Sequence, residues 1–193
     1  MRNSRVASLL LSATLAMNAQ GADWQAVLKA VAEHAPSSLA FEEEMHAFYL
    51  EQPAVSRGTL ERLPNGDLVK RIVKPEPAVI RLGRGRIQVS RDGQPAAPEA
   101  PAPAAARLLA DALVAVFGGD VEHVAAIFDV RLSTERTGTW TLTLVPRDGR
   151  LKEWVRELRL TGEGHQLRAF RLTQPNGDFI HTRLTPLPGT RHR

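Results

Sequence analysis

The sequence predicts a mainly β protein with a few helices, in which a strongly curved antiparallel sheet forms an incomplete β-barrel. Short segments of alternating apolar and polar residues follow one another with brief turns between them, which is typical of antiparallel neighbours. Two runs of such segments flank a central helical region, and a twisted open sheet rarely exceeds about ten strands without curling or closing. Helices lying over the concave face would act as a lid and leave an apolar cavity beneath them.

Residues 1–22 have the layout of a secretory signal peptide. The positive "MRNSR" precedes the apolar "VASLLLSATLAM", which is too short to span a bilayer, and small residues follow in "NAQGAD". Cleavage is expected near Ala19 or Ala22, and the alternative is a buried N-terminal helix. We therefore expect the mature chain to be exported, with residues 23–193 forming a single domain.

The first elements of this domain are a helix and a series of strands. Residues 23–34 have apolar side chains at helical spacing, and Pro36 follows. Residues 39–50 favour a strand, with a helix as the alternative, and an apolar face that includes Phe41, Met45 and Tyr49. Further strands are expected at 55–63, which contains Leu60, and at 67–73, 78–82 and 86–91.

The tetrapeptide "PNGD" occurs twice, at Pro64–Asp67 and at Pro175–Asp178, between alternating segments. Asn-Gly tolerates two positive φ angles, so both copies predict a type I′ hairpin rather than an internal repeat or a phosphate loop. "RDGQ" and "RDGR" are expected to be two further turns of the same kind.

The central region begins with a loop rich in Pro and Ala at 94–105, for which we expect an extended surface conformation. A helix over 106–117 follows and ends at two glycines, and Asp120 caps a second helix. The first helix carries a stripe that we expect to form the lid, although a permanently packed core helix is the alternative. The lid residues are Leu109, Leu113, Val116 and Phe117.

The strands after the helices carry the strongest pattern of the sequence. Trp140, Leu142 and Leu144 alternate with threonines, so their side chains point inward, and Leu144 is expected near the mouth of the cavity. Residues 154–162 are expected to form the next strand. The complete set of expected cavity residues is Phe41, Met45, Tyr49, Leu60, Trp140, Leu142, Leu144, Trp154, Leu158 and Leu160.

Composition and motifs indicate no enzyme, no cofactor and no metal site. The net charge of +4 includes Arg2 and Arg5 of the signal peptide, so the remainder is too small to predict a nucleic-acid partner. The six histidines are not at metal-ligand spacing, and there is no cysteine and therefore no disulfide. The "EEE" run at 42–44 splits between the two faces of a strand and is expected to be solvated.

The ordered set of segments resembles the LolA-like family, and within it the shorter LolA-related branch. The resemblance rests on Ser56, Gly58 and Leu60 in an "S-x-G-x-L" pattern, on the helix pair at 112–128, and on "WTLTLVP" followed by the hairpin at 170–184. It implies an incomplete β-barrel with a helical lid over an apolar cavity.

The same resemblance implies a function and marks two departures. Members of the family are periplasmic carriers that move lipoproteins toward the outer membrane, which implies acyl chains as cargo and a transient membrane protein as partner. An Arg-Pro pair tied to lid opening in the best-known carriers is here Leu63-Pro64, and residues 67–73 lack the aromatic residues of those carriers. Cargo and lid control are therefore expected to differ.

Three hypotheses follow. The first is a monomeric periplasmic carrier of a lipid or lipoprotein. The second is an envelope sensor or scaffold that binds a protein partner through the same fold. The third is an enzyme, for which His46 and His181 are the residues to test.

Overall fold

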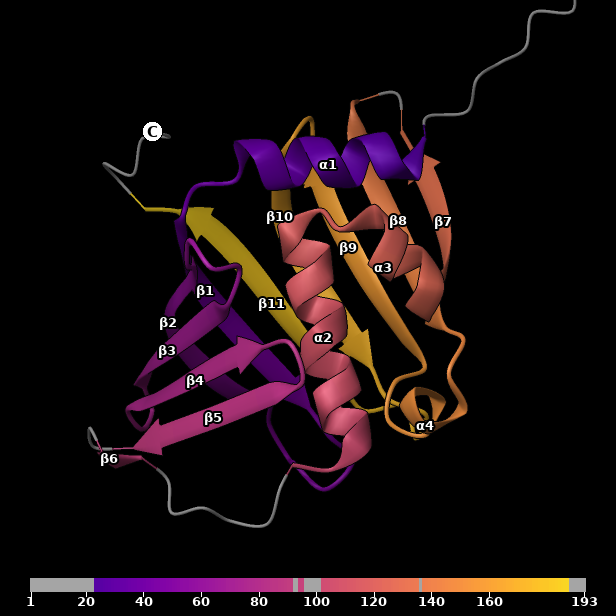
Figure 1. Cartoon of the computed structure of the whole chain (residues 1–193). Helices are drawn as coiled ribbons and strands as arrows, with labels where there is room; N and C mark the ends of the chain where they lie inside the picture. Colours follow the sequence, from indigo (N-terminus) through magenta and orange to yellow (C-terminus); the bar gives the residue numbers. More distant parts are fainter. Residues whose placement is uncertain (1–22, 92–93, 96–101, 136, 188–193) are drawn as a thin grey trace, which may run out of the picture.

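A computed structural model describes residues 23–91, 94–95, 102–135 and 137–187, and the predicted signal peptide lies outside these ranges (Figure 1). The helices are α1 (Trp24–His34), α2 (Ala104–Gly118), α3 (Val121–Ile127) and α4 (Gly149–Lys152). The strands are β1 (Ser38–His46), β2 (Ala54–Arg62), β3 (Leu68–Lys74), β4 (Ala78–Gly83), β5 (Arg86–Arg91), β6 (Gln94–Pro95), β7 (Phe128–Thr134), β8 (Thr139–Pro146), β9 (Glu157–Glu163), β10 (Gln166–Thr173) and β11 (Phe179–Pro186).

The strands form one antiparallel sheet of eleven strands in the order β6-β5-β4-β3-β2-β1-β11-β10-β9-β8-β7. The first and last strands of the chain pair in the middle of the sheet, where Phe41 lies opposite Leu184. The edge strands β6 and β7 do not pair with each other, so the barrel is incomplete. Figure 1 shows α2 in front of the sheet, between the β2–β5 strands and the β7–β10 strands. The predicted fold class is confirmed.

The predicted caps of the first three helices are present, although α2 begins two residues before the predicted start. The Asp23 carboxylate caps α1, and the Asp120 carboxylate accepts a hydrogen bond from the backbone N–H of His123 at the start of α3. Gly119 ends α2 with a φ of 70°, a left-handed conformation that glycine adopts at little cost. None of the described helices is long and apolar enough to cross a membrane.

The two "PNGD" hairpins have a different turn from the predicted one. Leu63 O accepts from Gly66 N at 2.9 Å, and Leu63 N donates to Asp67 O at 2.9 Å, which makes a three-residue loop. Pro64, whose φ is fixed near −65°, suits the first central position of a type I turn, and Gly66 then takes a φ of 87°. The type I′ prediction was wrong because it left proline outside the turn. The second copy has the same hydrogen bonds between Gln174 and Asp178 and between Gly177 and Gln174.

Other local predictions also need correction. β1 ends at His46, so the strand predicted through residue 50 is too long. Trp154 precedes β9, because "RDGR" starts the short helix α4 with Asp148 as its cap instead of forming a hairpin turn. The Pro/Ala-rich loop at 94–105 has its first two residues in β6 and its last two in α2. Its residues 96–101, and the centre of "RDGQ", lie outside the described residues.

Candidate functional site

The concave face of the sheet is defined by residues whose side chains pack against the helices. Leu39, Phe41 and Leu184 form a buried cluster against which Phe117 of α2 packs, so these side chains point inward. Because side chains alternate along a strand, the register then places Glu43 and Met45 of β1 on the same face.

The β7–β10 half of this face is filled by the protein itself. Trp140, Leu142 and Leu144 are 4%, 1% and 1% exposed, and they pack in the main core with residues of α1, α2 and α3. Leu158 and Leu160 of β9 lie opposite β8 and are buried in the same core. Leu144 therefore lies inside the core, between Val130 and Leu158, and the expected position near the mouth was wrong.

The β1–β5 half of the concave face is less completely covered. Met45 of β1, Ile72 of β3, Ile80 of β4 and Val89 of β5 are all half-buried, although they are large apolar residues. Ile180 of β11, which lies opposite Met45, is half-buried as well. Apolar surface therefore remains accessible on this side of α2.

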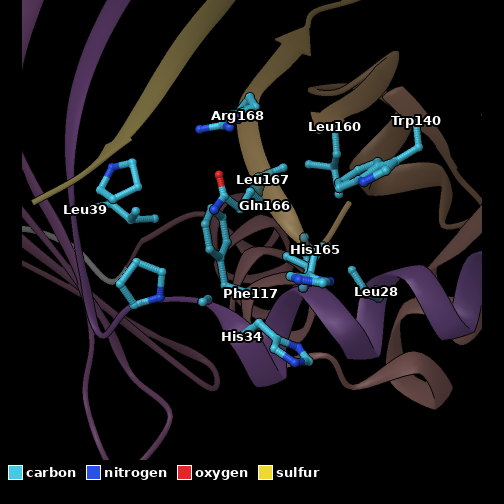
Figure 2. A pocket seen from close by; sticks show the side chains of 15 residues that line it. Leu28, His34, Leu39, Phe117, Trp140, Leu160, His165, Gln166, Leu167 and Arg168 are labelled. Carbon is cyan, nitrogen blue, oxygen red and sulfur yellow. The ribbon is translucent and has the colours of Figure 1, made fainter. Parts of the chain in front are cut away.

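A pocket of about 160 Å³ lies where the two halves meet beneath α1 (Figure 2). Figure 2 shows the ring of Phe117 between Leu39 on one side and Leu160 and Trp140 on the other. The remaining lining residues come from α1 and the segment after it, from α2, from the β9–β10 turn and from β10 and β11, and they are Leu28, Val31, His34, Ala35, Pro36, Val116, His165, Gln166, Leu167, Arg168 and Pro186. Most of this lining is apolar, with polar side chains from the start of β10.

A stacked pair of histidines lies beside this pocket. The rings of His34 and His165 have centroids 4.5 Å apart and an interplanar angle of 27°. His34 is the last residue of α1, where its Nδ1 lies 2.8 Å from Ala30 O, and His165 lies in the turn between β9 and β10. The pair joins the end of α1 to that turn. Sequence analysis missed it, because neither histidine lies in a motif and they are distant along the chain.

Two of the expected cavity residues lie outside the concave face. Tyr49 is 64% exposed in the loop after β1, where its ring contacts Phe48 edge to face with centroids 5.4 Å apart. Trp154 is 48% exposed in the loop before β9. Both residues belong to the segments in which the predicted strands are longer than the observed ones.

The other expected residues lie on the concave face. Phe41, Leu60, Trp140, Leu142, Leu144, Leu158 and Leu160 all belong to the two apolar clusters or pack against them, and Met45 lies beyond Glu43 on β1. Of the ten expected cavity residues, Trp140 and Leu160 line the pocket under α1. The sequence thus identified the inward direction of the strands but not which inward residues remain accessible.

The expected lid residues lie on α2 and pack against the main core. Val116 is 1% exposed, while Leu109, Leu113 and Phe117 are half-buried. The ring of Phe117 meets that of Phe170 on β10 edge to face, with centroids 5.8 Å apart. Phe117 packs against both apolar clusters and so spans the two halves of the concave face.

A charged pair interrupts the apolar face of β1. Lys70 Nζ lies 2.6 Å from both carboxylate oxygens of Glu43 and 4.7 Å from the centroid of the Phe41 ring. Thr182 Oγ1 donates to Glu43 at 2.9 Å, and Ser56 Oγ lies 3.5 Å from the same carboxylate. The side chains of Glu43 and Lys70 are 16% and 22% exposed.

The "EEE" run splits between the two faces of β1, as predicted, but Glu43 is largely buried and not solvated as expected. Glu42 and Glu44 point to the convex face. Glu42 lies 2.6 Å from Arg57 and from Arg183, and Arg183 also bonds Glu44 at 2.6 Å. The hydrogen bond from Arg183 is the main cause that lowers the pKa of Glu42 and of Glu44. This network is exposed at the surface, where such pairs contribute little to stability.

The titratable side chains expected to be of interest, His46 and His181, lie apart from the pocket under α1. No group of three potential metal-ligating side chains occurs among the described residues. His181 lies beside Arg171 and Glu44 on the convex face. Burial is the main cause that lowers the pKa of His181, and the positive charge of the nearby Arg183 is the second. The ring of His46 stacks on Phe179 with centroids 4.3 Å apart.

Solved structures similar to this chain share low identity with it. One is a LolA superfamily protein from Nitrosomonas europaea, with a TM-score of 0.42, 10% identity, and coverage of 84% of this chain and 91% of that one. LprF from Mycobacterium bovis has a TM-score of 0.40 and 11% identity, with 87% and 94% covered. A Pseudomonas aeruginosa MucA/MucB complex has a TM-score of 0.42 and 14% identity over 85% of this chain, which spans 58% of that one.

The family comparison covers almost the whole sequence. A search of curated proteins finds none that matches. The family model for outer membrane lipoprotein carrier protein LolA-like matches residues 16–188. This match includes all four described helices and all the described strands. The chain therefore belongs to the family of LolA-like outer membrane lipoprotein carrier proteins.

Proposed function

We propose that this protein is a periplasmic carrier that binds acyl chains of a lipid or lipoprotein and moves them toward the outer membrane. The observation that carries the proposal is the uneven filling of the concave face. Its β7–β10 half is a packed core, whereas Met45, Ile72, Ile80 and Val89 keep apolar surface accessible beside α2. We assign this accessible surface and the pocket under α1 to the acyl chains.

The size of the pocket indicates that loading requires movement. Ligand pockets commonly measure about 300–1,000 Å³, and the pocket under α1 measures about 160 Å³. Burying a sixteen-carbon chain is favourable by at most about 11 kcal/mol, from about 0.8 kcal/mol per methylene. This free energy would drive displacement of α2. Release is then the harder step, so we propose a transient partner protein in the inner or outer membrane.

The location and catalytic status belong to the same proposal. The layout of residues 1–22 and the family's description as lipoprotein carriers support export to the periplasm. Binding and release of a chain need no covalent chemistry, so we propose that the protein is a monomeric carrier and not an enzyme.

Native mass spectrometry of protein purified from an envelope extract tests the proposal. We expect a population carrying a bound lipid, which organic extraction removes and which an acyl ligand restores. A fluorescent fatty-acyl probe should bind saturably, and Ile80→Glu on the accessible half should weaken its binding. Arg81→Glu, one residue on and pointing to the other face, is the control. A protein that never binds lipid by either measurement would contradict the proposal.

A second candidate function is the binding of a protein partner, which one observation favours. Phe48 and Tyr49 are 87% and 64% exposed next to each other, and the Phe48 N–H donates to Asp178 in the β10–β11 turn at 3.0 Å. Exposed aromatic residues at a loop tip are frequent in interfaces. Cross-linking in cells should recover a partner that is lost on Phe48→Ser and Tyr49→Ser substitution. A partner retained by lipid-free protein would favour this function over the carrier.

A further inference from the structure

Glu43 lies in a polar row of the concave face, between two apolar rows, where a row is a set of inward residues that lie opposite one another on neighbouring strands. In the register, Glu43 lies between Ser56 and Thr182, which are both polar. The rows on either side of Glu43 are apolar. Phe41 lies opposite Leu184 in the row nearer the start of β1, and Met45 lies opposite Ile180 in the row nearer its end.

Lys70 belongs to another row, opposite Leu60 and Ile80, and its side chain reaches over the Phe41 ring to Glu43. An ion pair in such a position is weak evidence for a purely stabilising role. Taking an ammonium and a carboxylate partly out of water costs free energy that their attraction only offsets, and apolar replacements of similar size are often as stable. The cluster therefore requires an explanation other than stability. A polar group on the wall of an apolar site commonly fixes the orientation and specificity of a ligand.

The hydrogen-bonding capacity of the cluster is asymmetric. The Glu43 carboxylate accepts from Lys70, Thr182 and Ser56, so its acceptor capacity is largely used. The Lys70 ammonium has three N–H groups, and two of them serve the two oxygens of Glu43. Its remaining neighbour is the face of Phe41, a weaker partner than a carbonyl oxygen. The cluster can therefore offer one further donor.

The charge of the cluster selects which acceptor fits. Glu43 and Lys70 together are neutral, so an uncharged carbonyl can take the remaining N–H without adding net charge. A free carboxylate would place a second anion beside Glu43 at a partly buried position, where like charges repel strongly. The same reasoning excludes phosphate from contact with Lys70.

We propose that Lys70 and Glu43 form a site that binds the carbonyl group of an ester- or amide-linked acyl chain and disfavours free fatty acid. This inference rests on the proposed carrier function and names a specificity site within it. Lys70 donates to the carbonyl oxygen, and Glu43 holds Lys70 in place and repels anionic head groups. The acyl chain itself continues along the apolar rows on either side.

Displacement of the uncharged probe N-phenylnaphthylamine from the purified protein tests the site, with monolauroylglycerol and lauric acid as competitors at about pH 7.4, where a free carboxyl group is ionised. The parent should prefer the ester. Glu43→Gln leaves Lys70 with an unpaired charge and should shift the preference toward the acid by about tenfold or more. Lys70→Met should weaken ester binding by about tenfold relative to its effect on probe binding. Glu42→Gln is the matched control, since it removes a neighbouring carboxylate that points to the convex face.

Circular dichroism and thermal unfolding check that each variant is folded. If a single variant does not fold, the double variant Glu43→Gln/Lys70→Met removes both charges at nearly constant volume. It should fold and bind the ester about tenfold more weakly, relative to its effect on probe binding. The inference would be overturned if Glu43→Gln and Glu42→Gln showed the same preference between ester and acid, or if Lys70→Met bound the ester as tightly as the parent. Neither result would contradict the proposed carrier function. A parent that binds neither probe nor ester would instead refute the carrier function itself.

Discussion

The indole ring of Trp140 occupies the space that a side chain at Gly162 would need. The two residues lie opposite each other on β8 and β9, and a Cβ at Gly162 would come within 2.2 Å of the indole and 2.3 Å of Gln166 O. Trp140 Nε1 also donates to Gly164 O at 2.8 Å, which fixes the ring in this position. Because Trp140 lines the pocket under α1, a glycine on the neighbouring strand shapes one wall of that pocket.

Gly162→Ala should therefore be strongly destabilising. The new methyl group must displace the indole or the backbone of β10, and overpacking of this kind typically costs about 1–3 kcal/mol. Chemical denaturation should show this loss, together with a shift in tryptophan emission as the indole moves. Gly149→Ala is the control, because nothing lies within 4 Å of a Cβ at that position. A Gly162→Ala protein as stable as the parent would contradict this account of the pocket wall.

Leu144→Arg should prevent folding and not merely abolish ligand binding. Leu144 is 1% exposed and lies in the main core, so the guanidinium would be buried without a partner at a cost of several kcal/mol. Circular dichroism should show largely unfolded protein, whereas Thr141→Arg, which points to the other face of β8, should fold. A folded Leu144→Arg protein would mean that the β7–β10 half also opens to solvent.

Ligand binding should protect α2 from hydrogen exchange. Leu109, Leu113 and Phe117 are only half-buried, so added acyl chains can cover them. We expect slower exchange of α2 amides in the presence of monolauroylglycerol, and little change in β8 and β9, whose inward residues are already buried. Equal exchange with and without ligand would identify α2 as a permanent core helix.

Stability should fall as the pH drops below the ordinary pKa of histidine. Burial and neighbouring arginines lower the pKa of His181 from 6.5, so below pH 6.5 the unfolded chain binds a proton that the folded protein binds only at lower pH. The thermal midpoint should therefore decrease below that pH, and His181→Gln should flatten the decrease. His123→Gln on α3 serves as the control. An identical pH profile for parent and His181→Gln would rule out this contribution.

A further decrease is expected at more acidic pH. The pKa values of Glu42 and Glu44 lie below their ordinary value of 4.5 because both carboxylates bond Arg183. Their contribution is present above pH 4.5 and is lost as the pH falls through the lowered values. Arg183→Gln should weaken this second part of the decrease, and more for Glu44 than for Glu42, which keeps its bond to Arg57. It should also reduce the His181 part, because Arg183 is the second cause of the lowered pKa of His181.

The sequence alone determined part of the local structure of this protein, namely the helix caps and the inward direction of the strands. Alternation of Trp140, Leu142 and Leu144 with threonines fixed an inward face, because side chains on a strand point to opposite sides in turn. Asp120 and Gly119 fixed the ends of the helices through capping, which depends on residues within a single turn.

Only the tertiary structure decided which inward residues remain accessible. Leu144 and Ile80 both belong to alternating strands, yet Leu144 is covered by the main core and Ile80 is half-buried. Coverage depends on where α2 lies across the sheet, and that position results from long-range packing. The pairings of His34 with His165 and of Glu43 with Lys70 likewise join residues from different elements. Local patterns do not encode such contacts, because they form only when distant segments are brought together by the fold.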